Sequence, residues 1–372
     1  MTTQKDRVAL LPTSTAAVWV HEHGGPEQLI HEQRPLPALG LTDVLVSVDN
    51  AAVSGWDLKY RRGLQAGTKL PGRNPFPMPQ QLGREAAGTV VATGPETQLL
   101  HPGDRVVAVV HPENPYAPET YRGLGNLSTG IAIPGHQALG AYAEYVVRDE
   151  RLFLPVPDHV DLEQAGVTLW PYGTSHRVLR DRLRVTAGDT LLVTGAAGPM
   201  GLATIQLARI FGLRVIATTR YAERADSLRA TCGTDVEVVV TEDLGAAAEA
   251  VRDLTDGQGV DHAVDYSTSR DLLRFALDVI RLGGRLCPAA GEQNPPGPMP
   301  FTVFDLTRLE VDIAGVRGAR HDDAVRVLAL LTDGRLQSPI AARFPLSKAT
   351  EAHELMEHGT DVVGRILLKP GA

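Results

Sequence analysis

Cysteine is nearly absent from this chain, which contains only Cys232 and Cys287 among its 372 residues. Two thiols cannot build a disulfide framework, and they exclude any zinc site that needs three or four thiolate ligands. Scarce cysteine is also typical of proteins in a reducing compartment, so we expect a cytoplasmic protein.

Long apolar runs and an excess of positive charge are missing as well. No stretch approaches the roughly 20 apolar residues of a membrane-spanning helix, and the apolar run at 8–11 is too short for the core of a signal peptide. The net charge is −8 and the isoelectric point is about 5.8. We therefore expect neither nucleic acid nor a membrane as a partner.

The remaining composition, 43% hydrophobic and 22% charged residues, is ordinary for a globular chain, and the length suits two domains. Short alternating segments broken by Pro and Gly predict a β-rich, barrel-like part, with a long surface lobe at 110–140. Its expected strands are 16–20, 43–48, 88–92, 105–109 and 142–147. From about Leu162, strands alternate with helices, which predicts a parallel sheet covered on both faces. Its expected strands are 191–193, 214–218, 236–240, 262–265 and 285–289.

A glycine-rich turn follows the first strand of the predicted parallel sheet. It contains Gly195, Gly198 and Gly201, and it opens a helix-like segment at 202–211. Strand, turn, helix and a second apolar run at 213–217 are typical of a dinucleotide-binding unit, although the Gly-x-x-Gly-x-x-Gly spacing is not the commonest one. Gly195 permits the tight turn, Gly198 leaves room for a pyrophosphate, and Gly201 lets the helix approach the sheet. The helix N-terminus offers amide hydrogens and partial positive charge to the phosphates.

The end of the second strand distinguishes between the two nicotinamide cofactors. An NAD site usually has Asp or Glu about twenty residues after the turn, whereas this chain has Thr218, Thr219 and Arg220, with Arg224 nearby. A 2′-phosphate carries about −1.5 to −2 charges, and the Arg220 guanidinium matches it in charge and donor geometry. The sequence therefore predicts NADPH, the alternative being a surface arginine that serves solubility alone.

Several motifs occur together in one order along the chain: VHEHGGPEQL at 20–29, WDLKYRRG at 56–63, LGREAAGTV at 82–90, PGDRV at 102–106, GAYAEY at 140–145, the turn at 195–201, GGR at 283–285 and GRILL at 364–368. With them the chain resembles the medium-chain dehydrogenase/reductase superfamily, especially its zinc-independent quinone-reductase and enoyl-reductase branch. The resemblance implies an α/β fold with a doubly wound Rossmann domain at 161–311 that binds NADP. It also implies a β-rich, GroES-like catalytic domain formed by 1–160 and 312–372, an active-site cleft between the two domains, and a homo-oligomer.

The resemblance assigns the cofactor to one group of residues. Thr174 matches a threonine that contacts the nicotinamide, and the turn contributes its backbone. The full set that we expect at NADPH is Thr174, Gly195, Ala196, Ala197, Gly198, Pro199, Met200, Gly201, Thr219, Arg220, Arg224, Tyr266, Gly291 and Arg365.

Three positions depart from the zinc-dependent branch. Where those relatives have cysteine, histidine and usually a second cysteine, this chain has Ser54, Arg84 and Trp170. This set cannot reproduce thiolate and imidazole ligands, so we expect no catalytic metal. The lobe at 110–140, which has four cysteines in zinc-bearing relatives, has none here.

Without a metal, a conjugated carbonyl is an easier substrate than a simple ketone, because hydride addition to the β-carbon spreads charge into an enolate. One oxyanion donor is typically worth about 3–4 kcal/mol. Lys59, at the place of a proton-relay residue in relatives, is the leading candidate for that donor, and a solvated cation is the alternative. Tyr60 and Tyr172 are further candidates, each of which also suits core packing.

Trp56 and Trp170 should narrow and dry the pocket, which would suit a flat or conjugated carbonyl substrate; core packing is the alternative for both. Glu85 is expected in a structural ion pair with one of three arginines, Arg61, Arg62 or Arg84. The predicted activity is thus an NADPH-dependent, zinc-free reduction of an enone, quinone or enoyl thioester. A zinc-free carbonyl or alcohol dehydrogenase remains open, as does a redox-silent, cyclase-like accessory protein that keeps the cofactor fold.

Overall fold

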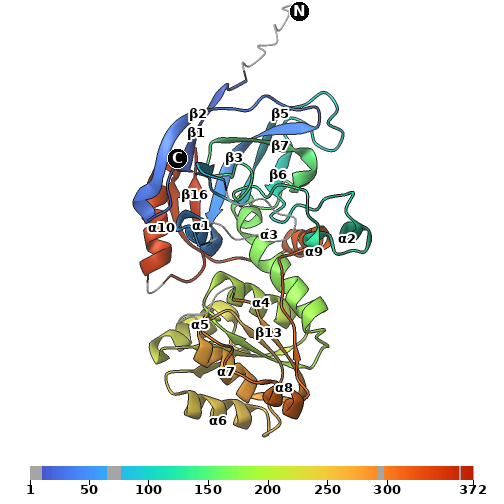
Figure 1. Cartoon of the computed structure of the whole chain (residues 1–372), viewed down its shortest axis with the longest axis vertical. Coiled ribbons are helices and arrows are strands. Elements are labelled where there is room, and N and C mark those ends of the chain that lie inside the picture. Colours follow the sequence, from blue (N-terminus) through green and yellow to red (C-terminus); the bar gives the residue numbers. More distant parts are fainter. Residues whose placement is uncertain (1–10, 65–76, 291–296, 360–361, 372) are drawn as a thin grey trace, which may run out of the picture.

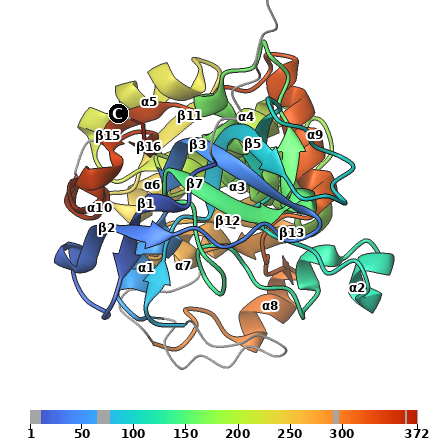
Figure 2. The same cartoon turned by 90° about the horizontal axis from the view of Figure 1, so that it is seen from above.

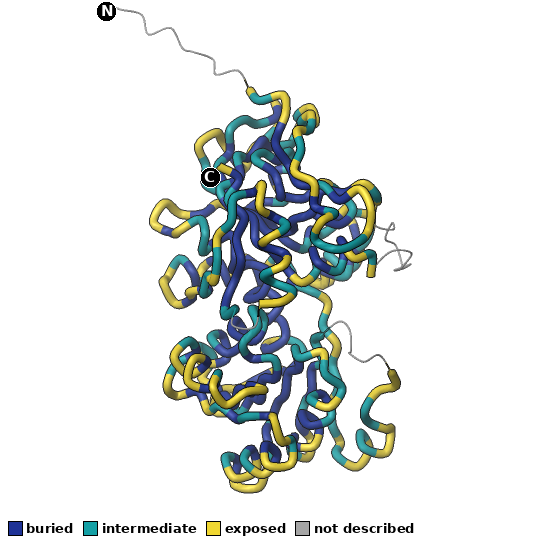
Figure 3. The backbone as a smooth tube through the Cα atoms, turned by 90° about the vertical axis from the view of Figure 1, so that its left-hand side faces the viewer, coloured by how far each residue is buried: buried dark blue, intermediate teal, exposed yellow. Residues whose placement is uncertain are grey.

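The computed structural model describes residues 11–64, 77–290, 297–359 and 362–371, and its elements form two parts that lie end to end (Figure 1). One part contains both ends of the chain and most of the β-structure, and the other contains the parallel sheet with helices α4 to α8. Buried backbone runs through the centre of both parts, and exposed segments lie on their outer sides (Figure 3).

The parallel sheet has six strands in the order β11-β10-β9-β12-β13-β14. This confirms the doubly wound α/β prediction, and the five expected strands occur with shifts of a few residues at their ends. The strands are β9 (Thr190–Thr194), β10 (Arg214–Thr219), β11 (Glu237–Val240), β12 (Val260–Asp265), β13 (Ile280–Pro288) and β14 (Asp312–Ile313).

Both faces of this sheet are covered because its strands are apolar on both sides. In β9, Leu191 and Val193 pack into one core with α4 and α5, whereas Leu192 packs into another with α6 and α7. The helices of this part are α4 (Pro199–Ile210), α5 (Ala225–Cys232), α6 (Leu244–Leu254), α7 (Arg270–Asp278) and α8 (Val303–Leu309). Helix α4 begins three residues before the predicted helix, since Pro199 is well suited to the first helical turn.

The β-rich part contains a three-stranded sheet, β2-β1-β4, and a seven-stranded sheet in which β15-β16-β3-β5-β6-β8 form the path and β7 pairs with β3. Strand β16, near the C-terminus, pairs with β3, so both ends of the chain contribute to this part. The strands are β1 (Ser14–Val20), β2 (Leu29–Pro35), β3 (Asp43–Val53), β4 (Gln80–Gln81), β5 (Glu85–Thr93), β6 (Arg105–Ala108), β7 (Tyr145–Asp149), β8 (Phe153–Pro155), β15 (Ile340–Pro345) and β16 (Arg365–Lys369).

The α-helices of the β-rich part, within the described residues, are α1 (Gly55–Arg61), α2 (Pro118–Tyr121), α3 (Leu162–Arg177), α9 (His321–Thr332) and α10 (Ala349–His358). Helix α3 packs against α9, α4 and strands β3 and β5, so it joins the two parts. Helix α2 belongs to the lobe at 110–140 and stands at the outer edge of the molecule (Figures 1 and 2).

Strand β14 extends the parallel sheet to Ile313, two residues beyond the boundary that we expected at 311. Leu286 of β13 pairs with Ile313, which gives the short strand its place at the sheet edge. The division at 1–160, 161–311 and 312–372 otherwise stays a prediction.

Candidate active site

A cavity of about 280 Å³ is lined by residues from both parts of the chain. It brings together nine of the predicted site residues: Trp56, Lys59, Trp170, Gly195, Gly198, Pro199, Met200, Tyr266 and Arg365. The others that line it are Ser54, Gly55, Pro171, Thr268, Ala289, Ala290 and Met356. We name this space the interdomain cavity.

The glycine turn forms one wall of the interdomain cavity, and its three glycines differ in what surrounds them. Gly195 has a φ of +67°, in the left-handed region that favours glycine. A Cβ on Gly201 would lie 2.5 Å from Gly195 O and 2.6 Å from the Ala196 Cα, so helix and strand are in close contact there. A Cβ on Gly198 would meet only Gly195 O, at 3.5 Å, and would otherwise enter open space.

The geometry of the turn suits a pyrophosphate. Gly198 is the N-cap of α4 and provides no side chain to satisfy the first amides, and Pro199 follows it. Those amides and the helix dipole favour an anion. Ala196 is fully buried and Ala197 is partly buried against the core, and neither of them lines the interdomain cavity.

Polar groups beneath the turn are linked to one another. Thr204 Oγ1 donates to Ser175 Oγ (2.8 Å) and lies 2.9 Å from the Tyr266 hydroxyl, which leaves the Tyr266 ring to line the cavity. Thr174, the residue before Ser175 in α3, is 7% exposed, and its Oγ1 has no hydrogen-bond partner among the residues that the structure describes. A buried hydroxyl without a partner is what a bound polar ligand would satisfy.

The end of β10 lies outside the interdomain cavity and is rich in positive charge. Thr219 is buried, whereas Arg220 is exposed and forms no ion pair with any residue in the described ranges. Two guanidinium groups lie close to the Tyr221 ring, those of Arg220 at 5.5 Å and Arg224 at 5.1 Å from its centre. The nearest carboxylate in sequence, Glu223, is exposed. Gly291, the last predicted cofactor residue, lies outside the described residues.

The three residues at which the resemblance would place zinc ligands, Ser54, Arg84 and Trp170, contact one another or their neighbours. The Arg84 guanidinium lies over the Trp170 ring, 4.3 Å from its centre, and Nη2 donates to Val110 O (2.9 Å). Ser54 caps α1 and donates to Asp57 Oδ2 (2.5 Å). All three residues are at most 7% exposed. Within the described ranges, no three His, Cys, Asp or Glu side chains are grouped as metal ligands.

Glu85 pairs with Arg365 of β16, so our expectation of a pair with Arg61, Arg62 or Arg84 is wrong. Arg61 is instead fully buried and pairs with Glu357 of α10. Burial raises the pKa of Glu85 to about 7 in spite of the neighbouring guanidinium. Because Arg365 also lines the interdomain cavity, this pair connects its wall to the core of the β-rich part.

Of the predicted donors, Lys59 alone lines the interdomain cavity. Its ammonium lies 4.8 Å from the centre of the Trp56 ring, which lines the same space. Tyr60 is 3% exposed and stacks on His136 with ring centres 4.3 Å apart. Tyr172 is 1% exposed and donates to Gln337 O (3.2 Å). Neither of these two tyrosines is among the residues that line the interdomain cavity.

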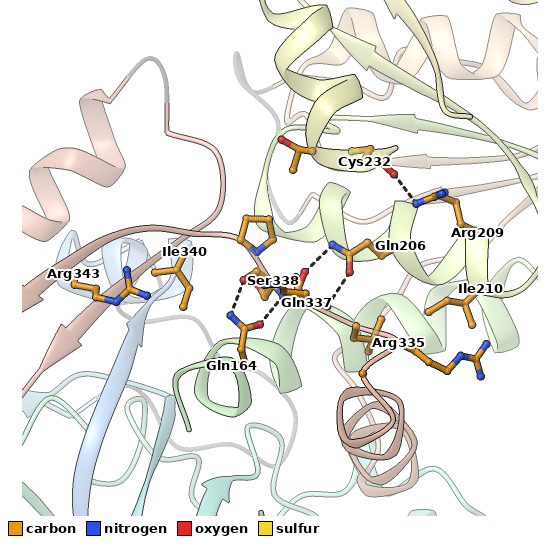
Figure 4. A pocket seen from close by; sticks show the side chains of 14 residues that line it. Gln164, Gln206, Arg209, Ile210, Cys232, Arg335, Gln337, Ser338, Ile340 and Arg343 are labelled. Carbon is orange, nitrogen blue, oxygen red and sulfur yellow. Dashed lines mark hydrogen bonds between the residues drawn. The ribbon is translucent and has the colours of Figure 1, made fainter. Parts of the chain in front are cut away.

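A larger cavity of about 770 Å³ lies along the segment 334–340, which returns from α9 to β15 (Figure 4). Gln164 of α3 forms two hydrogen bonds with Ser338, one to its carbonyl (3.1 Å) and one from its amide (2.8 Å). Gln206 of α4 donates to Gln337 O (2.9 Å). These bonds fix the returning segment to both parts. None of the predicted site residues lines this cavity, and we assign it no chemistry.

Sequence reasoning missed part of the interdomain cavity. Met356 comes from α10, and Ala289 and Ala290 follow β13. The two alanines lie at the carboxyl end of a parallel strand, where ligands bind in such sheets, and this position could have identified them. A methionine in an amphipathic helix carries no comparable signal.

Comparisons with known proteins agree with this arrangement. Residues 40–158 match the family model of the alcohol dehydrogenase GroES-like domain, and residues 199–333 match that of zinc-binding dehydrogenases. The chain is 25% identical to the human quinone oxidoreductase, covering 95% of this chain and 97% of that protein. It is 28% identical to a 2-haloacrylate reductase of Burkholderia sp, covering 96% and 99%. A solved structure of an NAD-dependent alcohol dehydrogenase aligns with a TM-score of 0.86 and 30% identity, covering 95% and 99%.

None of the helices in the part of the chain that the structure describes combines the length and apolar character that crossing a membrane requires.

Proposed function

Since the chain belongs to the medium-chain dehydrogenase/reductase superfamily and is an oxidoreductase of that type, we propose that it reduces an activated carbon–carbon double bond with NADPH and without zinc. The observation that carries this proposal is the Arg84 guanidinium stacked on Trp170 where relatives hold the metal. The substrate class is an enone, a quinone or an enoyl thioester.

The residues of this chain fit a nicotinamide cofactor. The uncapped amides of α4 and the open space at Gly198 suit the pyrophosphate, and the unpartnered hydroxyl of Thr174 suits the nicotinamide end. Arg220, with no carboxylate partner in the described residues, supports NADPH because a carboxylate there would repel a 2′-phosphate. When bound, the reduced nicotinamide supplies a hydride.

The zinc of the wider superfamily does not fit. A guanidinium remains charged at all physiological pH values and has no lone pair to offer a metal. Stacked on Trp170, the Arg84 side chain brings a fixed positive charge to the positions of the missing ligands. Ser54 is engaged with Asp57, which leaves its hydroxyl unsuited as a replacement ligand.

Lys59 is the residue that we assign to the developing enolate oxygen. Its ammonium can donate three hydrogen bonds, and in a partly closed cavity such a bond is stronger than in water. Trp56 lies beside the ammonium, and Trp56 and Trp170 both contribute aromatic surface to the walls of the interdomain cavity. A planar conjugated substrate suits such walls better than a tetrahedral one.

A second candidate is reduction of a saturated carbonyl, which the similarity to an NAD-dependent alcohol dehydrogenase favours. A redox-silent accessory protein that keeps the cofactor fold is the third, and the intact turn at 195–201 suits it as well as it suits the other two. Measuring NADPH and NADH oxidation with enones, quinones, enoyl thioesters and saturated ketones distinguishes these three candidate functions. We expect turnover with one of the first three classes and NADPH. Turnover with ketones alone would contradict the proposal, and so would a chain that never oxidises bound NADPH.

The cofactor preference has its own test. Arg220→Glu should reverse the preference for NADPH over NADH, because it replaces attraction with repulsion at the 2′-phosphate. We expect the ratio of kcat/KM with NADPH to kcat/KM with NADH to fall by about tenfold or more. Arg229→Glu, an exposed change of the same charge on α5, is the control and should leave the ratio unchanged. An unchanged ratio in Arg220→Glu would show that another group selects the cofactor.

A further inference from the structure

A second cavity, of about 580 Å³, lies in the β-rich part and shares no lining residue with the interdomain cavity. Its walls come from the lobe at 110–140, from β7, and from His321 at the start of α9. Most of the residues that line it are apolar, including Val109, Ile131, Leu139 and Val147. Its volume is within the usual range of small-molecule sites, about 300–1,000 Å³. We name it the lobe cavity.

One lining residue of the lobe cavity is a buried cation with no counter-charge. Arg148 of β7 is 7% exposed and forms no ion pair with any residue in the described ranges. Its Nη2 donates to Leu139 O at 3.3 Å, while Nε and Nη1 are out of contact with solvent and have no hydrogen-bond partner there. A buried charge that lacks a partner is strongly unfavourable in a folded protein.

The carboxylates near the lobe cavity are already engaged. Glu113 accepts a hydrogen bond from the His321 amide (2.7 Å). Asp149 accepts from the Arg151 guanidinium (2.8 Å) and from the Thr42 hydroxyl (2.8 Å). Burial is also the sole cause that lowers the pKa of Arg148, to about 10, with no contribution from either acid. The described residues therefore leave this guanidinium without a compensating charge.

We propose that the lobe cavity binds an amphipathic monocarboxylate, whose apolar body fills the cavity and whose carboxylate compensates the charge of Arg148. The apolar lining alone would suit any hydrophobic compound, and Arg148 is what selects an anion among them. Guanidinium–carboxylate contacts are charge-assisted and are about twice as strong as neutral hydrogen bonds. The site is separate from the one that we propose for the reductase chemistry, and its occupation does not depend on that proposal.

Dodecanoate and dodecanol serve as probes, because they share a chain and differ in charge. Titration calorimetry of the full chain should show one dodecanoate bound per protein, and dodecanol bound at least about tenfold more weakly. Saturation with NADPH should leave the dodecanoate affinity unchanged, since the two cavities are distinct. Competition between NADPH and dodecanoate would overturn the proposal, as would equal affinity for the acid and the alcohol.

Arg148→Met tests the selecting residue, and Arg151→Met is its matched control. Both residues line the lobe cavity, and both changes remove one positive charge, but Arg151 is exposed and already paired with Asp149. We expect Arg148→Met to weaken dodecanoate at least about tenfold and Arg151→Met to change it by no more than about twofold. Equal losses in the two variants would overturn the assignment to Arg148.

Stability gives an independent readout that does not require the ligand. Because Met keeps the unbranched apolar stem of arginine and removes the unpaired buried charge, Arg148→Met should raise the Tm of the ligand-free protein by a few degrees. A lower Tm would show that the guanidinium is compensated in the free protein, which would contradict the proposal. Ala132→Phe, at an exposed lining position, should reduce dodecanoate affinity with no change in Tm; unchanged affinity in this variant would place the ligand elsewhere.

Discussion

At the scale of single residues, charge determines what each part of the cofactor and substrate region can bind. Arg220 at the end of β10, Arg84 on Trp170 and Lys59 beside Trp56 are all cations, but only Arg84 is buried. An exposed guanidinium can recognise a phosphate, whereas a buried one excludes a metal ion from its surroundings.

Lys59→Met is the residue-scale prediction for the chemistry. Removing one oxyanion donor typically costs about 10²–10³ in kcat, so we expect kcat for the preferred acceptor to fall by about 100-fold while NADPH affinity stays the same. Arg62→Met, on the end of the same helix and outside the interdomain cavity, is the control. If Lys59→Met retained nearly full kcat, the lysine would be a solvated cation and the donor would be another group.

Residue types alone predicted some of these contacts and not others. The sequence shows which residues, Ser54, Arg84 and Trp170, stand at the expected positions of the zinc ligands, but it does not show that Arg84 stacks on Trp170. The Glu85–Arg365 pair joins residues 280 positions apart, and nothing in either local sequence identifies the partner. Tyr172 was a reasonable donor by position, but its hydroxyl is directed to the segment that returns from α9.

At the scale of elements, the strand–turn–helix unit from β9 to α4 was predicted well because its features are local. An apolar run of strand length and a glycine at the turn each restrict the backbone over a few residues. Pro199 in the first helical turn is a further local signal, yet the predicted helix began three residues too late. The short strands β4 and β14 and the helix α10 depend on distant partners, so their local sequences gave little indication of them.

The glycines of this unit allow a paired test. Gly201→Ala places a Cβ within 2.6 Å of the Ala196 backbone, and we expect overpacking to lower the free energy of unfolding by about 1–3 kcal/mol. Gly198→Ala meets open space, and its φ of −75° suits alanine. It should therefore leave stability unchanged and weaken NADPH binding. Thermal unfolding measures the stability of both variants, and cofactor titration measures their NADPH affinity. If Gly198→Ala lost stability and Gly201→Ala lost only NADPH affinity, the roles given to the two glycines would be wrong.

At the scale of the whole molecule, buried charges connect the two ends of the chain within the β-rich part. His353 of α10 lies 3.3 Å from Arg61 Nη1 and 3.1 Å from the Tyr142 hydroxyl. Because arginine can only donate, His353 Nδ1 accepts from it, and the neutral ring donates from Nε2. Burial, with the nearby Arg61 and Arg62, lowers the pKa of His353 to about 3.

This histidine makes global stability depend on pH. The unfolded chain binds a proton to His353 below its ordinary pKa of 6.5, whereas the folded chain does not until about pH 3. The associated stability is therefore present above pH 6.5 and is lost as the pH falls, by up to about 1.4 kcal/mol per pH unit. His353→Gln keeps an acceptor and a donor but does not titrate, so denaturant unfolding should show a shallower loss between pH 6.5 and 4. If the free energy of unfolding fell equally steeply with pH in the original protein and in His353→Gln, His353 would not be neutral in the folded chain.

The carbon that receives the hydride and the need for a metal distinguish the proposed reaction from its alternatives. Metal-depleted protein should be given NADPH that carries deuterium at the transferred position, together with the enone, quinone or thioester that gives the fastest turnover. For an enone or enoyl thioester, the account predicts full activity without added zinc and a saturated carbonyl product with deuterium at the β-carbon. Deuterium at the carbonyl carbon, or activity that appears only when zinc is restored, would contradict it.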